Sequence, residues 1–243
     1  MSIRSLRAAV SFLTVLPVAN ADGSPGERLG RAYFPAIGAL IGLVAGAAYV
    51  LMGALTTPLV GAAVAVGVLA ALTGALHLDG LGDTVDGLMT HGDVTRRLEV
   101  MRDPRLGSYG VVAVGVVLLL EFAAISSMST LRAIAGLIIA GALSRLATVA
   151  VIAFVPYVRA AGLGVAAWDS QRRGLDLAFG AACAAVVCLL DWKRALVALP
   201  FVALAAVSLA VIARRRIGGA TGDVCGAAAE LCQVATLLVF AAR

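Results

Sequence analysis

The chain has few charged and few aromatic residues for its length. Of 243 residues, 14% are charged and 5% are aromatic, whereas 61% are hydrophobic and the mean hydropathy is +1.01. A soluble domain usually has about 25% charged and about 45–50% apolar residues. The shortage of charge excludes an ordinary soluble domain and predicts a polytopic membrane protein. The shortage of aromatic residues argues against a transmembrane β-barrel with aromatic girdles.

Cysteine and histidine are also scarce. The chain has four Cys and two His, no Cys-x-x-Cys pair, and every Cys lies in an apolar segment (Cys183, Cys188, Cys225 and Cys232). This pattern favours small buried hydrophobic residues over a metal or redox motif. The net charge of +5 requires no nucleic-acid partner, because an excess of basic residues is expected in the cytoplasmic loops of membrane proteins.

Long apolar runs fill most of the sequence. A helix needs about 20 apolar residues to span a bilayer. Seven segments are candidates: 34–55, 58–78, 109–128, 132–155, 175–191, 195–213 and 223–242. Because 175–191 is short, we predict an all-α bundle of six to seven transmembrane helices. No linker marks a second domain, so residues 1–243 are predicted to form a single membrane-embedded domain. The sequence leaves open whether this domain forms a homo-oligomer.

The N-terminal segment, MSIRSLRAAVSFLTVLPVANA, has two interpretations. Its basic start, short apolar stretch and Ala-Asn-Ala end are typical of a signal peptide. The alternative is a retained amphipathic segment, about residues 1–30, that lies at the membrane interface. In either case the apolar stretch is too short to span a bilayer.

The distribution of Lys and Arg predicts the orientation. With seven spans and the N-terminus inside, the inner segments carry 14 of these residues, and the outer segments carry four (Arg132, Lys193, Arg194 and Arg243). By the positive-inside rule, the three long loops 77–108, 156–174 and 214–222 face the cytoplasm. A protein that gathers its polar residues on one face is more suited to chemistry there than to solute transport.

Acidic residues gather just after the second apolar run. The stretch ALHLDGLGDTVDGLMTHGD, residues 75–93, holds four of the 14 acidic residues. If the span continues as a helix, Asp79, Asp83 and Asp86 lie on one narrow face. Three carboxylates repel one another unless a cation lies among them, and hard oxygen ligands favour Mg²⁺, with Mn²⁺ as a substitute. Asp93 lies beyond two Gly residues and is left out. The alternative is a solvated acidic loop.

Arginines follow in RRLEVMRDPRLGSYG, residues 96–110. Arg102 and Arg105 flank Asp103, and Gly107 leads into the next span. Arginines beside a carboxylate-bound metal bind phosphoryl oxygens through paired hydrogen bonds; the alternative is anchoring at the membrane surface. Carboxylates and arginines together are the groups used in metal-assisted phosphoryl transfer. We therefore predict a catalytic cytoplasmic loop over about residues 77–108.

Charged residues inside the apolar runs are costly in lipid, and such residues usually face the interior of a bundle. Glu121, Arg145 and Glu230 are of this kind. Arg145 either forms an ion pair with one of the two acids or reaches a buried phosphate. At the start of the last run, Thr221 and Asp223 either cap a helix or bind a metal or substrate.

Several ordered motifs resemble a known family. LHLDGLGDTVDGL, RLEVMRDPRLGSYG, ALSR and GGATGDVCGA, with FLTVLP (12–17) and FPAIGALIG (34–42), are similar to the bacterial cobalamin synthase family of adenosylcobinamide-GDP ribazoletransferases. Because FLTVLP belongs to the family pattern, the resemblance favours retention of the N-terminal segment. It implies a multi-pass enzyme of the bacterial inner membrane with its active site facing the cytoplasm.

The resemblance also implies a reaction. These enzymes join adenosylcobinamide-GDP to α-ribazole or its 5′-phosphate and release GMP, in a late step of vitamin B12 biosynthesis that requires Mg²⁺. The implied metal ligands are Asp79, Asp83 and Asp86. The implied catalytic residues are Asp83, Asp86, Asp103 and Arg105. The implied substrate-binding residues are His77, Arg102, Gly107, Arg145, Thr221 and Asp223.

Two residues fit this assignment less well, and two rival classes exist. His77 falls on the helix face opposite the aspartates, and Gln233 stands where the family more often has an acid. Membrane CDP-alcohol phosphotransferases share the partial pattern DTVDG (83–87), but the Ala-Arg that their motif needs is Thr90-His91 here. The other rival is an ion-coupled transporter, and the chain lacks the Pro-broken helix pairs expected of one.

Overall fold

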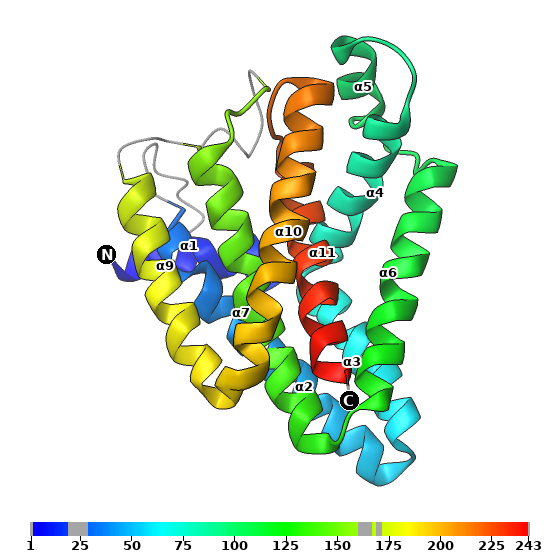
Figure 1. The fold of residues 1–243 in the computed structure, drawn as a ribbon, viewed down its shortest axis with the longest axis vertical. Helices are drawn as coiled ribbons and strands as arrows, with labels where there is room; N and C mark the ends of the chain where they lie inside the picture. Colours follow the sequence, from blue (N-terminus) through cyan, green and yellow to red (C-terminus); the bar gives the residue numbers. More distant parts are fainter. Residues whose placement is uncertain (1, 19–28, 160–166, 169–171, 243) are drawn as a thin grey trace.

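The computed structural model describes residues 2–18, 29–159, 167–168 and 172–242 (Figure 1). In chain order its elements are α1 (Ile3–Leu13), η1 (Arg31–Tyr33), α2 (Phe34–Leu55), α3 (Pro58–Leu72), α4 (Leu76–Met89), α5 (Val94–Val100), α6 (Ser108–Ser127), α7 (Thr130–Phe154), α9 (Arg173–Cys188), η2 (Leu189–Asp191), α10 (Trp192–Ile217) and α11 (Gly222–Ala241). Within the described ranges, β pairing is limited to an isolated bridge between Tyr157 and Ala220. The expected all-α architecture is confirmed.

Five segments of the described chain are long and apolar enough to cross a membrane, or six if the bent pair α3–α4 counts as one span. One of them, Arg173–Ile217, has 45 residues. As a single straight helix it would be about 68 Å long, against a hydrocarbon core of about 30 Å. Figure 1 shows instead two arms, α9 and α10, that meet at η2. They correspond to the predicted spans 175–191 and 195–213, in line with the expected six to seven helices.

A sharp bend separates α3 from α4, where the sequence analysis expected one helix over residues 58–78. The two axes differ by 84°. Gly74 is left-handed (φ +59°), and the N–H groups of Gly74 and Ala75 donate to the carbonyl oxygens of Ala71 and Ala70. This is the Schellman pattern, which ends a helix at a left-handed residue. The expected continuous span was wrong, and α4 leaves the bend in a new direction.

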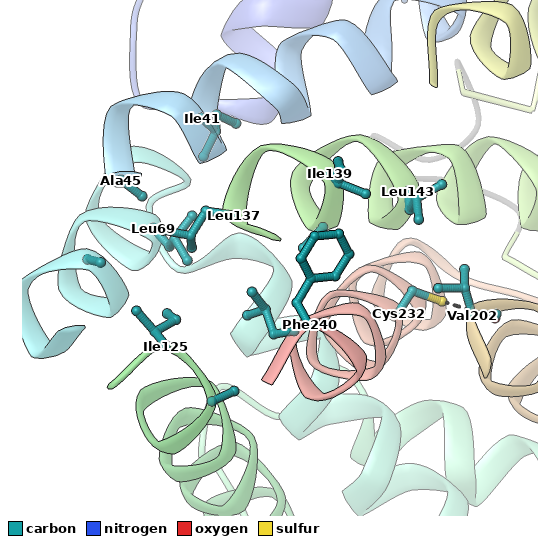
Figure 2. Packing of buried hydrophobic residues seen from close by; sticks show 14 of the residues in the cluster. Ile41, Ala45, Leu69, Ile125, Leu137, Ile139, Leu143, Val202, Cys232 and Phe240 are labelled. Atoms are coloured by element: carbon teal, nitrogen blue, oxygen red, sulfur yellow. Dashed lines mark hydrogen bonds between the residues drawn. The ribbon is translucent and has the colours of Figure 1, made fainter. Parts of the chain in front are cut away.

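Helices α2 and α7 pack with their backbones in contact. A Cβ atom at Gly38 would lie 2.0 Å from the carbonyl oxygen of Gly141, and one at Gly42 would lie 2.1 Å from that of Leu137. Only small residues permit this approach. The core residues labelled beside this contact in Figure 2 come from α2, α3, α6, α7, α10 and α11: Ile41, Ala45, Leu69, Ile125, Leu137, Ile139, Leu143, Val202, Cys232 and Phe240.

All four cysteines are free, as expected. Cys225 and Cys232 are buried, and Cys183 and Cys188 are partly exposed. The Cys232 thiol donates to the carbonyl oxygen of Val202 at 3.5 Å (Figure 2). The buried pair therefore has the predicted role of small core residues.

Helix α1 runs across the bundle rather than along it (Figure 1). Ala9 and Leu13 are buried, and the Phe12 ring stacks on Phe34 with a centroid distance of 5.8 Å. The N–H of Val15 donates to the carbonyl oxygen of Leu72, so the segment after α1 meets the α3–α4 bend. The placement of this segment at the membrane interface stays a prediction, and its residues 1 and 19–28 lie outside the described residues.

Three long connections meet at one end of the bundle (Figure 1). They are the connection α4–α5–α6, the described residues 155–159 that follow α7, and the connection α10–α11. Val158 N–H donates to the carbonyl oxygen of Ala220, and Ala220 N–H donates to that of Pro156. Arg159 Nη2 donates to the carbonyl oxygen of Met101 at 3.2 Å. The three loops predicted to share one side are thus in contact, while the side of the membrane that they face remains a prediction.

Candidate active site

Helix α4 presents two aspartates at the end where the loops meet. It crosses α11 in close contact: a Cβ atom at Gly80 would lie 2.9 Å from the carbonyl oxygen of Asp223, and one at Gly226 would lie 3.2 Å from the Cα of His77. Glycine at both positions lets the two backbones touch. The crossing brings Asp79 and Asp83 next to the start of α11, with Asp79 exposed and Asp83 half-buried. The predicted helical placement of these acids is confirmed.

Asp86, the third predicted acid, joins α4 to α6. Its Oδ2 accepts a hydrogen bond from the backbone N–H of Gly107 at 2.7 Å, and its Oδ1 accepts one from Gly110 at 2.9 Å. These N–H groups belong to the first turn of α6, where helix donors lack internal partners and a negative charge is favourable. Asp86 and Gly107 thus meet in a capping contact that the sequence analysis did not predict.

Asp223 lies at the start of α11 and pairs with an arginine from another loop. Its Oδ2 is 2.7 Å from Nη2 of Arg159 and accepts a hydrogen bond from the Thr221 hydroxyl at 3.2 Å. The Thr221 oxygen also accepts from the N–H of Val224 at 3.3 Å, which makes Thr221 the N-cap of α11. The capping interpretation of Thr221 is confirmed, and the backbone of Asp223 lies against α4 at Gly80.

The carboxylates of this end interact through space. The negative charges of Asp79, Asp223 and Asp86 repel the Asp83 carboxylate, and the positive charge of Arg159 attracts it. Hard carboxylate oxygens are the donors that Mg²⁺ prefers, so their chemistry fits the expected cation. In the described part of the chain, however, no three His, Cys, Asp or Glu side chains are already arranged to hold a metal ion. Instead, the Arg159 guanidinium supplies positive charge beside Asp223. The metal ligands therefore remain a prediction.

Asp103 and Arg105 form an exposed pair in the loop before α6. Arg105 donates from Nε to Oδ1 at 2.9 Å and from Nη2 to Oδ2 at 2.7 Å, and its backbone N–H also donates to Oδ1. These hydrogen bonds lower the pKa of Asp103 from 3.8 to about 2. A carboxylate with so low a pKa is ionised near neutral pH, and the catalytic role of Asp103 stays a prediction. Arg102, beside this pair, is exposed.

The side chains of Arg145 and His77 are buried inside the bundle, away from the carboxylates of Asp79, Asp83 and Asp223. Arg145 is 2% exposed, and its Nη1 donates to Ser144 and to the side-chain oxygen of Gln233, both at 2.9 Å. Its Nη2 lies 3.4 Å from His77 Nδ1. Gln233 donates in turn to Glu121 at 2.7 Å. Within the described residues no acid comes within ion-pair distance of Arg145. The alternative of a direct ion pair is thus replaced by a glutamine relay, and the substrate-binding role of Arg145 stays a prediction.

Two arginines at this end were missed by the sequence analysis. Arg159 bridges Asp223 and Met101, as described above. Arg97 is buried, and its Nη1 donates to the carbonyl oxygen of Leu88 at 2.6 Å, which closes the C-terminal end of α4. Their carbonyl partners lie 58 and 9 residues away in the sequence, respectively, and no local motif marks either contact. Both had been counted only as positive charges of inner loops.

Comparisons with known proteins agree with the motifs. A family model described as Cobalamin-5-phosphate synthase matches residues 5–241. An adenosylcobinamide-GDP ribazoletransferase of Ectopseudomonas mendocina is 41% identical over 241 residues, which cover 97% of each chain. Proteins of the same name from Bradyrhizobium diazoefficiens (36%, covering 99% of this chain and 94% of the relative) and Stutzerimonas stutzeri (40%, covering 96% of each) are also similar. No solved structure matches. The chain belongs to the cobalamin-5-phosphate synthase family.

Proposed function

We propose that the chain is a membrane-embedded adenosylcobinamide-GDP ribazoletransferase. A ribose hydroxyl oxygen of α-ribazole, or of its 5′-phosphate, would form a bond to the phosphorus next to the cobinamide arm. The bond from that phosphorus to the bridging pyrophosphate oxygen would break, and GMP would leave. The observation that carries this proposal is the gathering of Asp79, Asp83 and Asp223 at the α4–α11 crossing, in a chain whose relatives carry this name.

The aspartates at the crossing would have distinct roles. Asp79 and Asp83, joined by Asp223, would hold Mg²⁺. When bound, this ion would neutralise charge on the pyrophosphate and stabilise the leaving GMP. The hydroxyl proton would pass to a carboxylate of the same group. Asp86 would position α4 against α6 through its bonds to Gly107 and Gly110.

Arginines near the crossing would bind substrate. Arg102 is exposed in the loop before α6, close in sequence to the Asp103–Arg105 pair. A guanidinium suits phosphoryl oxygens because its planar donors match their geometry. Arg102 and Arg105 are therefore assigned to the negative charge of adenosylcobinamide-GDP at the mouth of the site.

The site would face the cytoplasm of a bacterial inner membrane. The support is the predicted bias of Lys and Arg toward the end that carries the loops. In a variant without native cysteines, Arg216→Cys and Ser129→Cys would place thiols at exposed positions of opposite ends. A membrane-impermeant maleimide added to intact spheroplasts should label Ser129→Cys and spare Arg216→Cys. The reverse labelling would overturn this orientation.

The activity is tested with purified protein in detergent. Adenosylcobinamide-GDP, α-ribazole and Mg²⁺ should yield GMP and adenosylcobalamin, and EDTA should stop the reaction. Asp83→Asn should lose turnover while the protein stays folded, because Asp83 has no hydrogen bond to the rest of the fold among those in the described chain. Asp191→Asn, at the far end of the bundle, should remain active. Turnover of a CDP-linked lipid alone would favour the rival phosphotransferase.

A further inference from the structure

We propose that Arg159 binds the pyrophosphate of adenosylcobinamide-GDP, and that it leaves Asp223 to do so. This inference rests on the proposed function and adds a residue to it. In the substrate-free protein Arg159 and Asp223 neutralise each other; with substrate and metal present, each would take a new partner.

The guanidinium of Arg159 has donors to spare. Its Nη2 carries both contacts of the side chain in the described structure, to Asp223 at 2.7 Å and to the Met101 carbonyl at 3.2 Å. The buried Nε has no hydrogen-bond partner among the described residues. Arginine is always charged and has five N–H donors in a planar fork. A group bound through one nitrogen, with Nε buried and unpaired, is poised to gain hydrogen bonds from a bidentate acceptor such as a phosphate.

The surrounding charges make the exchange favourable. Arg159 acts on both Asp83 and Asp223, at the place where Asp79 also contributes negative charge. Without a metal, the guanidinium offsets part of this repulsion. A divalent cation would supply the positive charge that Asp223 now obtains from Arg159. The pyrophosphate would supply the negative charge that Arg159 obtains from Asp223. The exchange therefore leaves both Arg159 and Asp223 with a partner of opposite charge.

The backbone just before Arg159 is held by pairing with the segment before α11, whereas the Arg159 side chain is held through Nη2 alone. Tyr157 and Val158 pair with Ala220, and the Tyr157 ring lies 4.7 Å from the ring of Trp168. Because the main chain before Arg159 is fixed next to α11, we assign the exchange to a rotation of the arginine side chain. The alternative is that Arg159 merely ties the loops together through Asp223 and Met101.

Binding without turnover separates these two roles. The dissociation constant of adenosylcobinamide-GDP is measured by equilibrium dialysis with no α-ribazole present, once in Mg²⁺ and once in EDTA. In Mg²⁺, Arg159→Gln should weaken binding about tenfold or more, because hydrogen bonds to a charged group are lost. In EDTA, where no cation replaces Arg159 at Asp223, Asp223→Asn should instead tighten binding, because it releases Arg159. This tightening should disappear in the Arg159→Gln background. If it arose only from removal of a negative charge, it would persist there.

Three controls complete the experiment. Adenosylcobinamide, which lacks the GDP, should bind equally well to wild type and Arg159→Gln; this also reports that the variant is folded. Arg159→Lys, which keeps the charge but not the fork, should lose part of the affinity for adenosylcobinamide-GDP only. Arg214→Gln removes an exposed arginine at the same end of the bundle and should bind like wild type.

The outcomes distinguish this inference from the function on which it rests. Equal weakening by Arg159→Gln and Asp223→Asn, with no further loss in the double variant, would identify a structural tie and overturn the inference. So would an Arg159→Gln protein that binds adenosylcobinamide-GDP as wild type does. A wild-type protein that neither binds nor converts adenosylcobinamide-GDP would instead refute the proposed function itself.

Discussion

The side-chain amide of Gln233 on α11 donates a hydrogen bond to Glu121 on α6, at 2.7 Å. Its carbonyl oxygen accepts one from Arg145 on α7, at 2.9 Å. An amide can serve both neighbours because it has a donor and an acceptor. An acid at position 233 would place another carboxylate beside Glu121, in a small cavity that Glu230 also lines. Glutamine at a position where an acid was expected therefore has a physical reason.

The first prediction concerns this relay. Gln233→Leu should lower the free energy of unfolding by about 1–3 kcal/mol, because a buried guanidinium and a buried acid each lose a hydrogen-bond partner. Thermal unfolding in detergent, followed by tryptophan fluorescence, measures the change. Ser208→Leu, a polar-to-leucine change at an exposed position of α10, should leave the unfolding temperature near that of wild type. An unfolding temperature that Gln233→Leu does not lower would mean that the relay contributes nothing to stability.

Asp86 should matter for stability as well as for activity. Asp86→Ala removes both acceptors at the start of α6 and should cost about 3 kcal/mol, since hydrogen bonds to charged groups are worth about 1.5–3 kcal/mol each. Asp86→Asn keeps one acceptor oxygen and should lose less. The same unfolding measurement tests this, with Asp83→Asn as the comparison that should change turnover alone. Equal stability of Asp86→Ala and wild type would contradict the capping role.

Two glycines of α6 provide a matched pair. A Cβ atom at Gly110 would lie 2.4 Å from Asp86 Oδ2 and 2.9 Å from the carbonyl oxygen of Gly82, whereas one at Gly115 would meet nothing within 4 Å. Gly110→Ala should therefore destabilise the protein by about 1–3 kcal/mol through overpacking. Gly115→Ala should be neutral or stabilise α6 by up to about 1 kcal/mol, from helix propensity. Similar unfolding temperatures for the two variants would rule out the close contact of α4 with α6.

The Asp103–Arg105 pair predicts a pH dependence. Because the pKa of Asp103 is lowered to about 2, below the value of about 3.9 for an unfolded aspartate, its ionised form favours the folded state. That contribution is present above about pH 4 and is lost as the pH falls toward 2. Carbon-13 NMR of labelled aspartates should show one carboxyl, absent in Asp103→Asn, that titrates near pH 2. In Arg105→Gln the same signal should titrate close to the ordinary value, and an unshifted signal would disprove the pairing.

Helix positions follow closely from hydropathy in this chain. The expected span 34–55 coincides with α2, and 109–128, 132–155 and 223–242 differ from α6, α7 and α11 by two residues or fewer at each end. The stripe of Asp79 and Asp83 was also predictable, because it depends only on the helical repeat. The α3–α4 bend was missed because hydropathy shows that a segment is apolar but not where its helix axis changes direction. Its one local signal was Gly74, and an isolated glycine is common inside membrane helices.

The partners of the polar side chains could not be predicted from the sequence. Asp86 meets Gly107, Arg159 meets Asp223 and Gln233 meets Arg145 only after the helices have packed. Each pair depends on which helix faces which, a choice made by contacts such as Gly38 with Gly141. The residue type limits what a side chain can bind, and the packing of the helices determines which of the suitable partners it meets. Arg159 illustrates this limit, because its sequence context is that of any loop arginine.

The crossing of α4 with α11 also determines when the site can exist during synthesis. Asp79 and Asp83 leave the ribosome early, while Asp223 and Gly226 belong to the last helix of the described chain. Chains are made from the N-terminus, and domains tend to fold in that order. Until α11 enters the bundle, the acids of α4 lack both Asp223 and the glycine contact that fixes their helix. A nascent chain that ends before residue 222 therefore has only part of the proposed active site, even if its earlier helices have already packed.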